Sequence, residues 1–172
     1  SQNKNQMVSI ISIKSKKLTG EIFVPGDKSI SHRALILGSC GIGETSIENL
    51  LESEDVLATM SALKSLGVNI RRRNNFWYVQ GNGLGSLKSP NKVLYLGNSG
   101  TGVRLVMGLV SGCDSTASFN GDESLNKRPM KRILTPLEQS GTQIVSNEDK
   151  LPITINGSKI PIPIKYETSL SS

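Results

Sequence analysis

The chain has 172 residues, 36% of them hydrophobic, which suits one medium-sized core and excludes disorder along its whole length. No apolar run approaches the roughly 18 residues of a membrane span, and residues 1–6 lack a signal-peptide pattern, so we expect no membrane partner and a cytoplasmic protein, or one whose targeting segment has been removed. The net charge of +6 suits nucleic acid or small anions, but aromatic residues make up only 4% of the chain, without a repeated platform for bases, so we expect no nucleic-acid partner.

The segment GDKSISHR at 26–33 lies between an expected strand at 21–25 and an expected, mostly apolar helix at 29–40. The polar residues that gather where this helix begins are Lys28, Ser29 and Arg33. Unpaired backbone N–H groups and the positive end of the helix dipole favour an anion there, and the two cations add bonds suited to phosphate or carboxylate. A Ser-capped core helix with two basic residues on its solvated side would leave the same pattern, so the segment alone does not decide.

The chain then repeats itself: each of two copies is predicted to form a strand, a helix, a strand, a helix and a pair of strands. The landmarks that recur in order are Arg33 with Arg104, Thr45 with Thr116, and Asn49 with Asn120. In the first copy the expected strands are 21–25, 45–49, 68–72 and 76–80, and the expected helices are 29–40 and 54–66. In the second copy the strands are 93–97, 116–120, 142–145 and 153–156, and the helices are 101–111 and 130–140. A third copy would begin with a strand at 160–166, and an opening strand at 7–13 belongs to neither copy.

The first helix of each copy is apolar nearly all round, so we expect it to be buried, with the strands outside it. The second copy opens this helix with LGNSGTGVR at 96–104, whose glycines allow close approach of the backbone to a ligand. Thr101 and Arg104 can hydrogen-bond an anion there. The spacing matches neither a dinucleotide fingerprint nor a P-loop, and a glycine-rich turn needed only for tight packing is the alternative.

The segment GDESLNKRPMKR at 121–132 is expected to place four cations at the start of the helix at 130–140, with Pro129 in the first turn. These cations are Lys127, Arg128, Lys131 and Arg132. Cations at a helix N-terminus oppose the dipole, so we expect one of them, best Arg128, to meet an anion shared with that terminus; an exposed basic turn is the alternative. Three such helix starts suggest a ligand with more than one anionic group.

Other chemistry finds little support in the sequence. His32 is the only histidine, and we expect it to be a packing or capping residue rather than part of a catalytic triad. Cys40 and Cys113 lie in apolar stretches without metal-ligand spacing, so we expect two buried thiols and no metal site.

The segments PGDKSISHRALILG, NLLESEDV, LGNSGTGVRL and GDESLNKRPM together resemble the 5-enolpyruvylshikimate-3-phosphate synthase family over residues 21–172. The resemblance implies a mixed α/β (α+β) fold of repeated βαβαββ units with buried helices and outer sheets, an inside-out α/β barrel of the enolpyruvyl transferase type that is incomplete here. Residues 1–20 would belong to a second, absent lobe. Residues 21–172 would form the first lobe, with repeats at about 21–83 and 92–157 and the start of a third.

The resemblance further implies a cytoplasmic transferase, monomeric at full length, with no metal or cofactor, that moves the enolpyruvyl group of phosphoenolpyruvate to the 5-hydroxyl of shikimate 3-phosphate. The residues it implies for shikimate 3-phosphate are Lys28, Ser29, Arg33 and Ser172. Those it implies for phosphoenolpyruvate are Lys28, Gly100 and Arg128, surrounded by Asn98, Thr101 and Arg104. Lys28 would be catalytic, and Lys28 and Arg128 would stabilise the charge of the reacting groups.

In this family the acid/base carboxylates and several cations lie in the lobe that this chain lacks, so we expect the 172-residue chain alone to be inactive. A non-catalytic anion-binding module, or a structural fragment, is the alternative. A glycine at position 100 would leave room beside phosphoenolpyruvate, so the full enzyme is expected to be sensitive to the competing inhibitor glyphosate.

Overall fold

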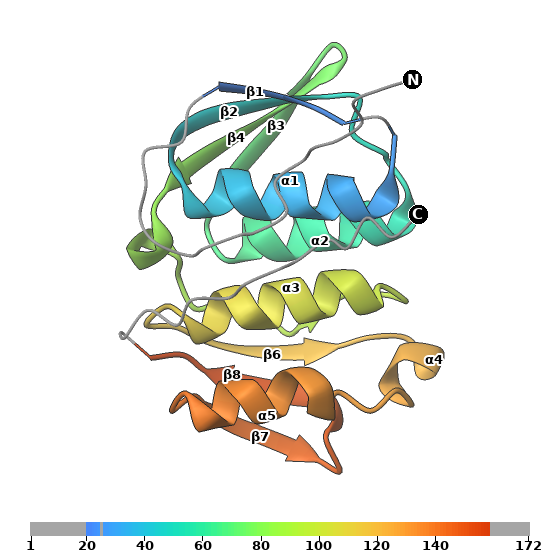
Figure 1. Ribbon diagram of the computed structural model, residues 1–172, viewed down its shortest axis with the longest axis vertical. Helices are drawn as coiled ribbons and strands as arrows, with labels where there is room; N and C mark the ends of the chain where they lie inside the picture. The colour runs from blue at the N-terminus through green and yellow to red at the C-terminus, as the bar shows by residue number, and fades with distance from the viewer. Residues whose placement is uncertain (1–19, 25, 159–172) are drawn as a thin grey trace.

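The computed structural model describes residues 20–24 and 26–158 (Figure 1). Two stretches of the chain share the order strand, helix, strand, helix and two strands, and each has one further short helical element. The elements of the first unit are β1 (Gly20–Phe23), α1 (Lys28–Cys40), β2 (Ile42–Glu48), α2 (Glu54–Ser65), β3 (Asn69–Arg73), β4 (Phe76–Asn82) and the 3-10 turn η1 (Leu84–Ser86). Those of the second are β5 (Leu94–Tyr95), α3 (Gly100–Ser111), β6 (Thr116–Asn120), α4 (Glu123–Asn126), α5 (Lys131–Gln139), β7 (Gln143–Asn147) and β8 (Lys150–Asn156). The strands expected at 7–13 and 160–166, and Ser172, lie outside the described residues.

The two units share one sheet topology, which confirms the repeat seen in the sequence. Within the described residues, the strand orders are β1-β2-β4-β3 and β5-β6-β8-β7. In each sheet the first pair is parallel and the other two are antiparallel. Strand β8 illustrates why these segments form half-buried strands: Leu151, Ile153 and Ile155 alternate with more exposed residues, so that one face of the strand lies in the core.

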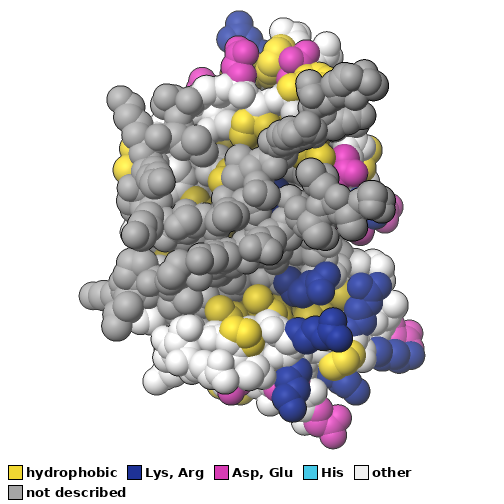
Figure 2. All heavy atoms as spheres, in the orientation of Figure 1, with side chains coloured by type: hydrophobic (Ala, Val, Ile, Leu, Met, Phe, Trp, Pro, Cys, Tyr) yellow, Lys and Arg dark blue, Asp and Glu magenta, His cyan; other side chains and the backbone are white. Residues whose placement is uncertain are grey.

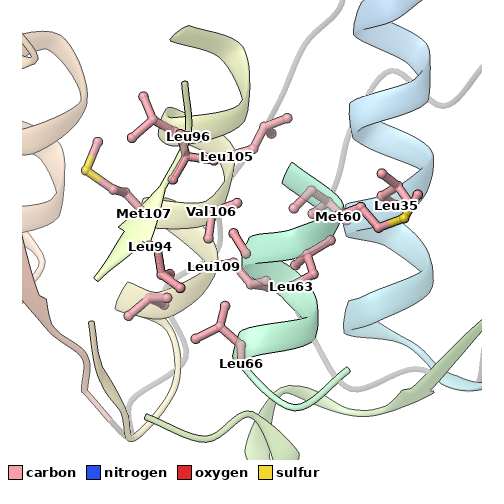
Figure 3. Packing of buried hydrophobic residues seen from close by; sticks show 14 of the residues in the cluster. Leu35, Met60, Leu63, Leu66, Leu94, Leu96, Leu105, Val106, Met107 and Leu109 are labelled. Carbon is pink, nitrogen blue, oxygen red and sulfur yellow. The ribbon is translucent and has the colours of Figure 1, made fainter. Parts of the chain in front are cut away.

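Helices α1, α2 and α3 lie between the two sheets, as the apolar character of the first helix of each copy predicts (Figure 1). In α3 the buried face is nearly the whole helix, since only Thr101 and Arg104 escape burial. Figure 3 shows how α2 fills the space between its neighbours: Met60 lies toward Leu35 of α1, and Leu63 lies toward Leu109 of α3. Both cysteines are buried, as expected, and burial raises the pKa of Cys40 to about 12.

One short helix was not predicted, and it changes an argument about the site. The helix expected at 130–140 is α5, which begins at Lys131 with Met130 as its N-cap, but the short helix α4 precedes it. Lys127 is therefore the C-cap of α4, and Arg128 follows it, so neither cation opposes a helix dipole as expected. The N-cap of α1 is likewise Asp27, whose carboxylate accepts a hydrogen bond from the Ile30 N–H at 2.9 Å, and not a serine.

Every helix in the described part of the chain is too short or too polar to cross a membrane.

Candidate anion-binding site

Three helices begin at one edge of the molecule, and a side chain caps each of them. Asp27 caps α1, Ser53 caps α2 and Ser99 caps α3, each by accepting a hydrogen bond from a backbone N–H of the first turn. Figure 1 shows these N-terminal ends on the same side of the molecule, and the three helices contact one another. The positive ends of three helix dipoles therefore face the same region, which favours anions there.

The first group of predicted site residues lies in the first two turns of α1. We call Lys28, Ser29 and Arg33 the α1 corner. The Arg33 guanidinium donates a hydrogen bond from Nη1 to Ser29 Oγ at 2.8 Å, so these two side chains are held together. Lys28 Nζ lies 3.0 Å from Asp55 Oδ2 of α2, and the lysine side chain is 54% exposed, so an anion can reach it from solvent.

The second group lies at the start of α3. We call Gly100, Arg104 and Arg128 the α3 corner. A Cβ atom placed on Gly100 would lie 2.7 Å from Arg128 Nη1 and 3.8 Å from Arg104 Nη2, so two guanidinium groups converge on one point beside the glycine. Arg104 also donates from Nε to the Gly100 carbonyl at 2.9 Å. Neither guanidinium forms an ion pair with any carboxylate of the described residues.

Asn98 and Thr101 flank the α3 corner. Asn98 donates from Nδ2 to both carboxylate oxygens of Asp122 at 3.1 Å, and Asp122 in turn caps α4 by accepting from the Leu125 N–H. Hydrogen bonds from the Leu125 N–H and from Asn98 lower the pKa of the Asp122 carboxyl, so it is ionised. Thr101 is half-buried in the first turn of α3. Asn98 therefore orients a fixed carboxylate, a role that sequence reasoning did not foresee.

Cations cluster on the surface around the α3 corner. Figure 2 shows Lys and Arg side chains gathered over the region where Figure 1 places the start of α3 and α4. The exposed cations of these elements and of the start of α5 are Arg104, Lys127, Arg128, Lys131 and Arg132. Lys127 pairs with Glu123 at 3.2 Å, so much of its charge is compensated locally, while the charge of Arg128 adds to the hydrogen bonds from Leu125 and Asn98 that lower the pKa of the Asp122 carboxyl.

His32 connects the two corners, and sequence reasoning missed how. The ring is buried, with Nδ1 2.8 Å from Thr59 Oγ1 of α2 and Nε2 3.5 Å from Ser99 Oγ, the N-cap of α3. The expected packing role of His32 fits this burial. Its partners could not be found from the sequence, because they are distant in the chain and meet only once three helices pack.

The arrangement suits two anionic groups held side by side, one at each corner. Guanidinium groups, an ammonium group and capped helix starts are suited to phosphate and carboxylate oxygens. In the described residues, no group of His, Cys, Asp and Glu is arranged to hold a metal ion. Ser172, the remaining predicted site residue, lies outside the described residues.

Comparison with known proteins points to one family. The family model for EPSP synthase (3-phosphoshikimate 1-carboxyvinyltransferase) matches residues 13–172. A 3-phosphoshikimate 1-carboxyvinyltransferase from Rhodopseudomonas palustris (strain BisA53) is 52% identical over 162 residues, which are 92% of this chain and 36% of that protein. One from Bradyrhizobium diazoefficiens is 52% identical over 158 residues, which are 90% of this chain and 34% of that protein.

A solved structure agrees with these relatives. The structure of EPSP synthase from Acinetobacter baumannii superposes with a TM-score of 0.73 at 40% identity, covering 87% of this chain and 34% of the other. The similarity thus extends to the fold, an incomplete form of the enolpyruvyl transferase architecture. The chain spans about a third of the length of the curated relatives that it matches.

Proposed function

Because the chain belongs to the EPSP synthase (3-phosphoshikimate 1-carboxyvinyltransferase) family, we propose that it supplies substrate-binding residues to an enzyme that transfers the enolpyruvyl group of phosphoenolpyruvate to the 5-hydroxyl of shikimate 3-phosphate. The observation that carries this proposal is the convergence of the Arg104 and Arg128 guanidinium groups beside Gly100. Two like charges this close are unfavourable without a counter-ion, and an anion between them relieves the repulsion.

Each corner takes one substrate in this proposal. Lys28, Ser29 and Arg33, together with Ser172, bind shikimate 3-phosphate. Gly100, Arg128 and Lys28 bind phosphoenolpyruvate, with Asn98, Thr101 and Arg104 around it. Because His32 of α1 contacts Ser99, the N-cap of α3, the two ligands would be neighbours, as a transfer between them requires.

The chemistry that these residues assist is an addition followed by an elimination. The 5-hydroxyl oxygen loses its proton and bonds to C2 of phosphoenolpyruvate while C3 gains a proton. The tetrahedral intermediate then loses phosphate from C2 and a proton from C3, which restores the double bond. Lys28 and Arg128 stabilise the negative charge of the phosphate and carboxylate groups, and the two corners orient the reactants. We further propose that the protein is a cytoplasmic monomer in which residues 21–172 belong to one lobe and residues 1–20 to the other.

Isothermal titration calorimetry of the protein as its gene encodes it tests the proposal. We expect shikimate 3-phosphate to bind, and Lys28→Ala and Arg33→Ala each to weaken binding by about tenfold or more, because a charge-assisted hydrogen bond contributes about 1.5–3 kcal/mol. Arg73→Ala is the control, since it removes the same charge from an exposed position on β3. Equal binding of inorganic pyrophosphate would instead favour a non-catalytic anion-binding module, and unchanged affinity in both corner variants would refute the site.

A further inference from the structure

His32 lies where α1, α2 and the N-cap of α3 each contribute a polar side chain. Its ring is 0% exposed, and so is Thr59, while Ser99 is 2% exposed. Each ring nitrogen faces the hydroxyl of a different helix: Nδ1 is 2.8 Å from Thr59 Oγ1, and Nε2 is 3.5 Å from Ser99 Oγ, the long end of hydrogen-bonding distance. Buried ring nitrogens need hydrogen-bond partners, and here the partners come from two other helices, so the ring links α1 to α2 and to the start of α3.

The contact of His32 with Ser99 affects the start of α3, because Ser99 is the N-cap of that helix. Ser99 Oγ accepts a hydrogen bond from the Gly102 N–H at 2.9 Å and so determines where the first turn of α3 begins. Gly102 is packed against the same hydroxyls: a Cβ atom there would lie 2.5 Å from Ser99 Oγ and closer still to Thr59 Oγ1. The start of α3 therefore has no room to approach α2 without displacing these groups.

The state of the ring suits this role. Burial lowers the pKa of His32 to about 4, with Lys28 and Arg33 adding to the effect and Asp55 opposing it. The imidazole is therefore neutral near pH 7, with one nitrogen that donates and one that accepts. A hydroxyl can take either part, so both contacts can be satisfied at once.

We propose that His32 is a positioning residue, which sets the distance between the α1 corner and the α3 corner through its contacts with Thr59 and Ser99. His32 is next to Arg33 on α1, and Ser99 is next to Gly100 on α3, so the ring and its partners are the direct connection between the two corners. His32 touches neither substrate. The inference rests on the proposed function, because its consequence is the spacing of two bound anions.

Steady-state kinetics of the protein as its gene encodes it separate the two substrates. We expect His32→Leu to raise the KM for phosphoenolpyruvate about fivefold to tenfold, since the α3 corner loses a positioning hydrogen bond worth about 1 kcal/mol. The KM for shikimate 3-phosphate should stay within about twofold, because the Arg33 to Ser29 hydrogen bond lies within α1. His32→Gln, which places an amide near the position of Nε2, should return the KM for phosphoenolpyruvate close to its value in the unmodified protein.

Ser39→Ala is the matched control. Ser39 lies two turns along the same face of α1, is 1% exposed, and donates its own buried hydrogen bond to the Leu35 carbonyl at 2.7 Å. If the role of His32 were purely structural, His32→Leu and Ser39→Ala would both lower the melting temperature, and in each variant the two KM values would change together. If His32→Leu does not fold, Thr59→Val replaces it, because this change keeps the side-chain shape and removes the hydroxyl. We expect Thr59→Val to raise the KM for phosphoenolpyruvate and to leave the KM for shikimate 3-phosphate nearly unchanged.

The outcomes distinguish the inference from the proposed function. If the unmodified protein transfers no enolpyruvyl group, the proposed function fails. If it does, and His32→Leu or Thr59→Val leaves the KM for phosphoenolpyruvate unchanged or raises both KM values equally, the positioning role of His32 is refuted while the proposed function stands.

Discussion

At the scale of single residues, Gly100 is where one methyl group would change the candidate site most. A Cβ atom there would lie 2.7 Å from Arg128 Nη1, too close for contact, so the guanidinium would have to move. That nitrogen is the far end of a flexible side chain, so the movement costs the fold little. The site, in contrast, loses the position of one of its two converging cations.

We therefore expect Gly100→Ala to leave the free energy of unfolding within about 0.5 kcal/mol of the original value. The same change should weaken the binding of phosphoenolpyruvate and of its competitor glyphosate. A glycine leaves room for the inhibitor beside Arg128, and an alanine would not. Inhibition assays on the protein as its gene encodes it should give a glyphosate inhibition constant at least about tenfold higher for the variant, since displacement of a charged partner costs about 1.5 kcal/mol or more. Equal inhibition of both proteins would contradict the placement of glyphosate beside Gly100.

The charged residues of the site could be predicted from the sequence, whereas their partners could not. Lys28, Ser29 and Arg33 stand together in the chain, and a glycine turn before an apolar helix is a local signal. The convergence of Arg104 and Arg128 joins two different segments, and so do the contacts of His32. Contacts of that kind depend on helix packing, which no local pattern of residues encodes.

At the scale of elements, two glycines at equivalent positions explain how each sheet meets its buried helix. Gly81 ends YVQG in β4 and Gly157 follows the equivalent TIN of β8. A Cβ atom on Gly81 would overlap backbone carbonyl oxygens of Gly38 and Gly41 at the end of α1. One on Gly157 would overlap those of Val110 and Cys113 at the end of α3.

These overlaps are with backbone, which cannot move without displacing a helix. We expect Gly81→Ala and Gly157→Ala each to lower the free energy of unfolding by about 1–3 kcal/mol, the usual cost of overpacking, or more. Urea denaturation measures the change. Gly85→Ala is the control, because nothing lies within 4 Å of a Cβ atom at that position. If the Gly81 variant were as stable as the Gly85 variant, the strand end would not pack against α1 as described.

The same scale shows where element prediction failed. The periodicity of apolar residues in the sequence placed most helices and strands to within a few residues, because one face of each element is apolar. The start of α5 was placed to within one residue, but the Pro129 signal was assigned to the first turn of that helix, whereas Pro129 precedes its N-cap, Met130. Asp122 is the N-cap of a separate short helix, α4, and Lys127 is the C-cap of that helix.

At the scale of the whole molecule, the repeat determines where the site can form. Each unit buries its first helix between the sheets, and the equivalent helices α1 and α3 contact each other. Their starts, and therefore the two corners, lie at the same edge. The anion-binding residues are thus assembled by the association of the two units, and the contact of α1 with α3 determines how the two corners lie relative to each other.

Three aspartates at this edge already have hydrogen-bonding or ion-pair partners. Asp27 accepts a hydrogen bond from Ile30 as the cap of α1, Asp55 is paired with Lys28, and Asp122 is held by Leu125 and Asn98, which lower its pKa. A general acid near neutral pH needs a raised pKa, the opposite of the shift at Asp122. In the proposed reaction the addition and the elimination both move a proton at C3 of phosphoenolpyruvate, so we expect the described edge to bind substrates without completing the reaction.

We expect the 172-residue chain by itself to bind shikimate 3-phosphate but to release no phosphate from a mixture of the two substrates, since it spans about a third of the length of its relatives. Calorimetry measures the binding, and a phosphate-release assay measures turnover, with the 3-phosphoshikimate 1-carboxyvinyltransferase from Rhodopseudomonas palustris (strain BisA53) as the positive control. Binding that is lost in Arg33→Ala would assign the retained affinity to the α1 corner. Measurable turnover by the chain alone would contradict this account and would require a carboxylate of this chain to act as the acid.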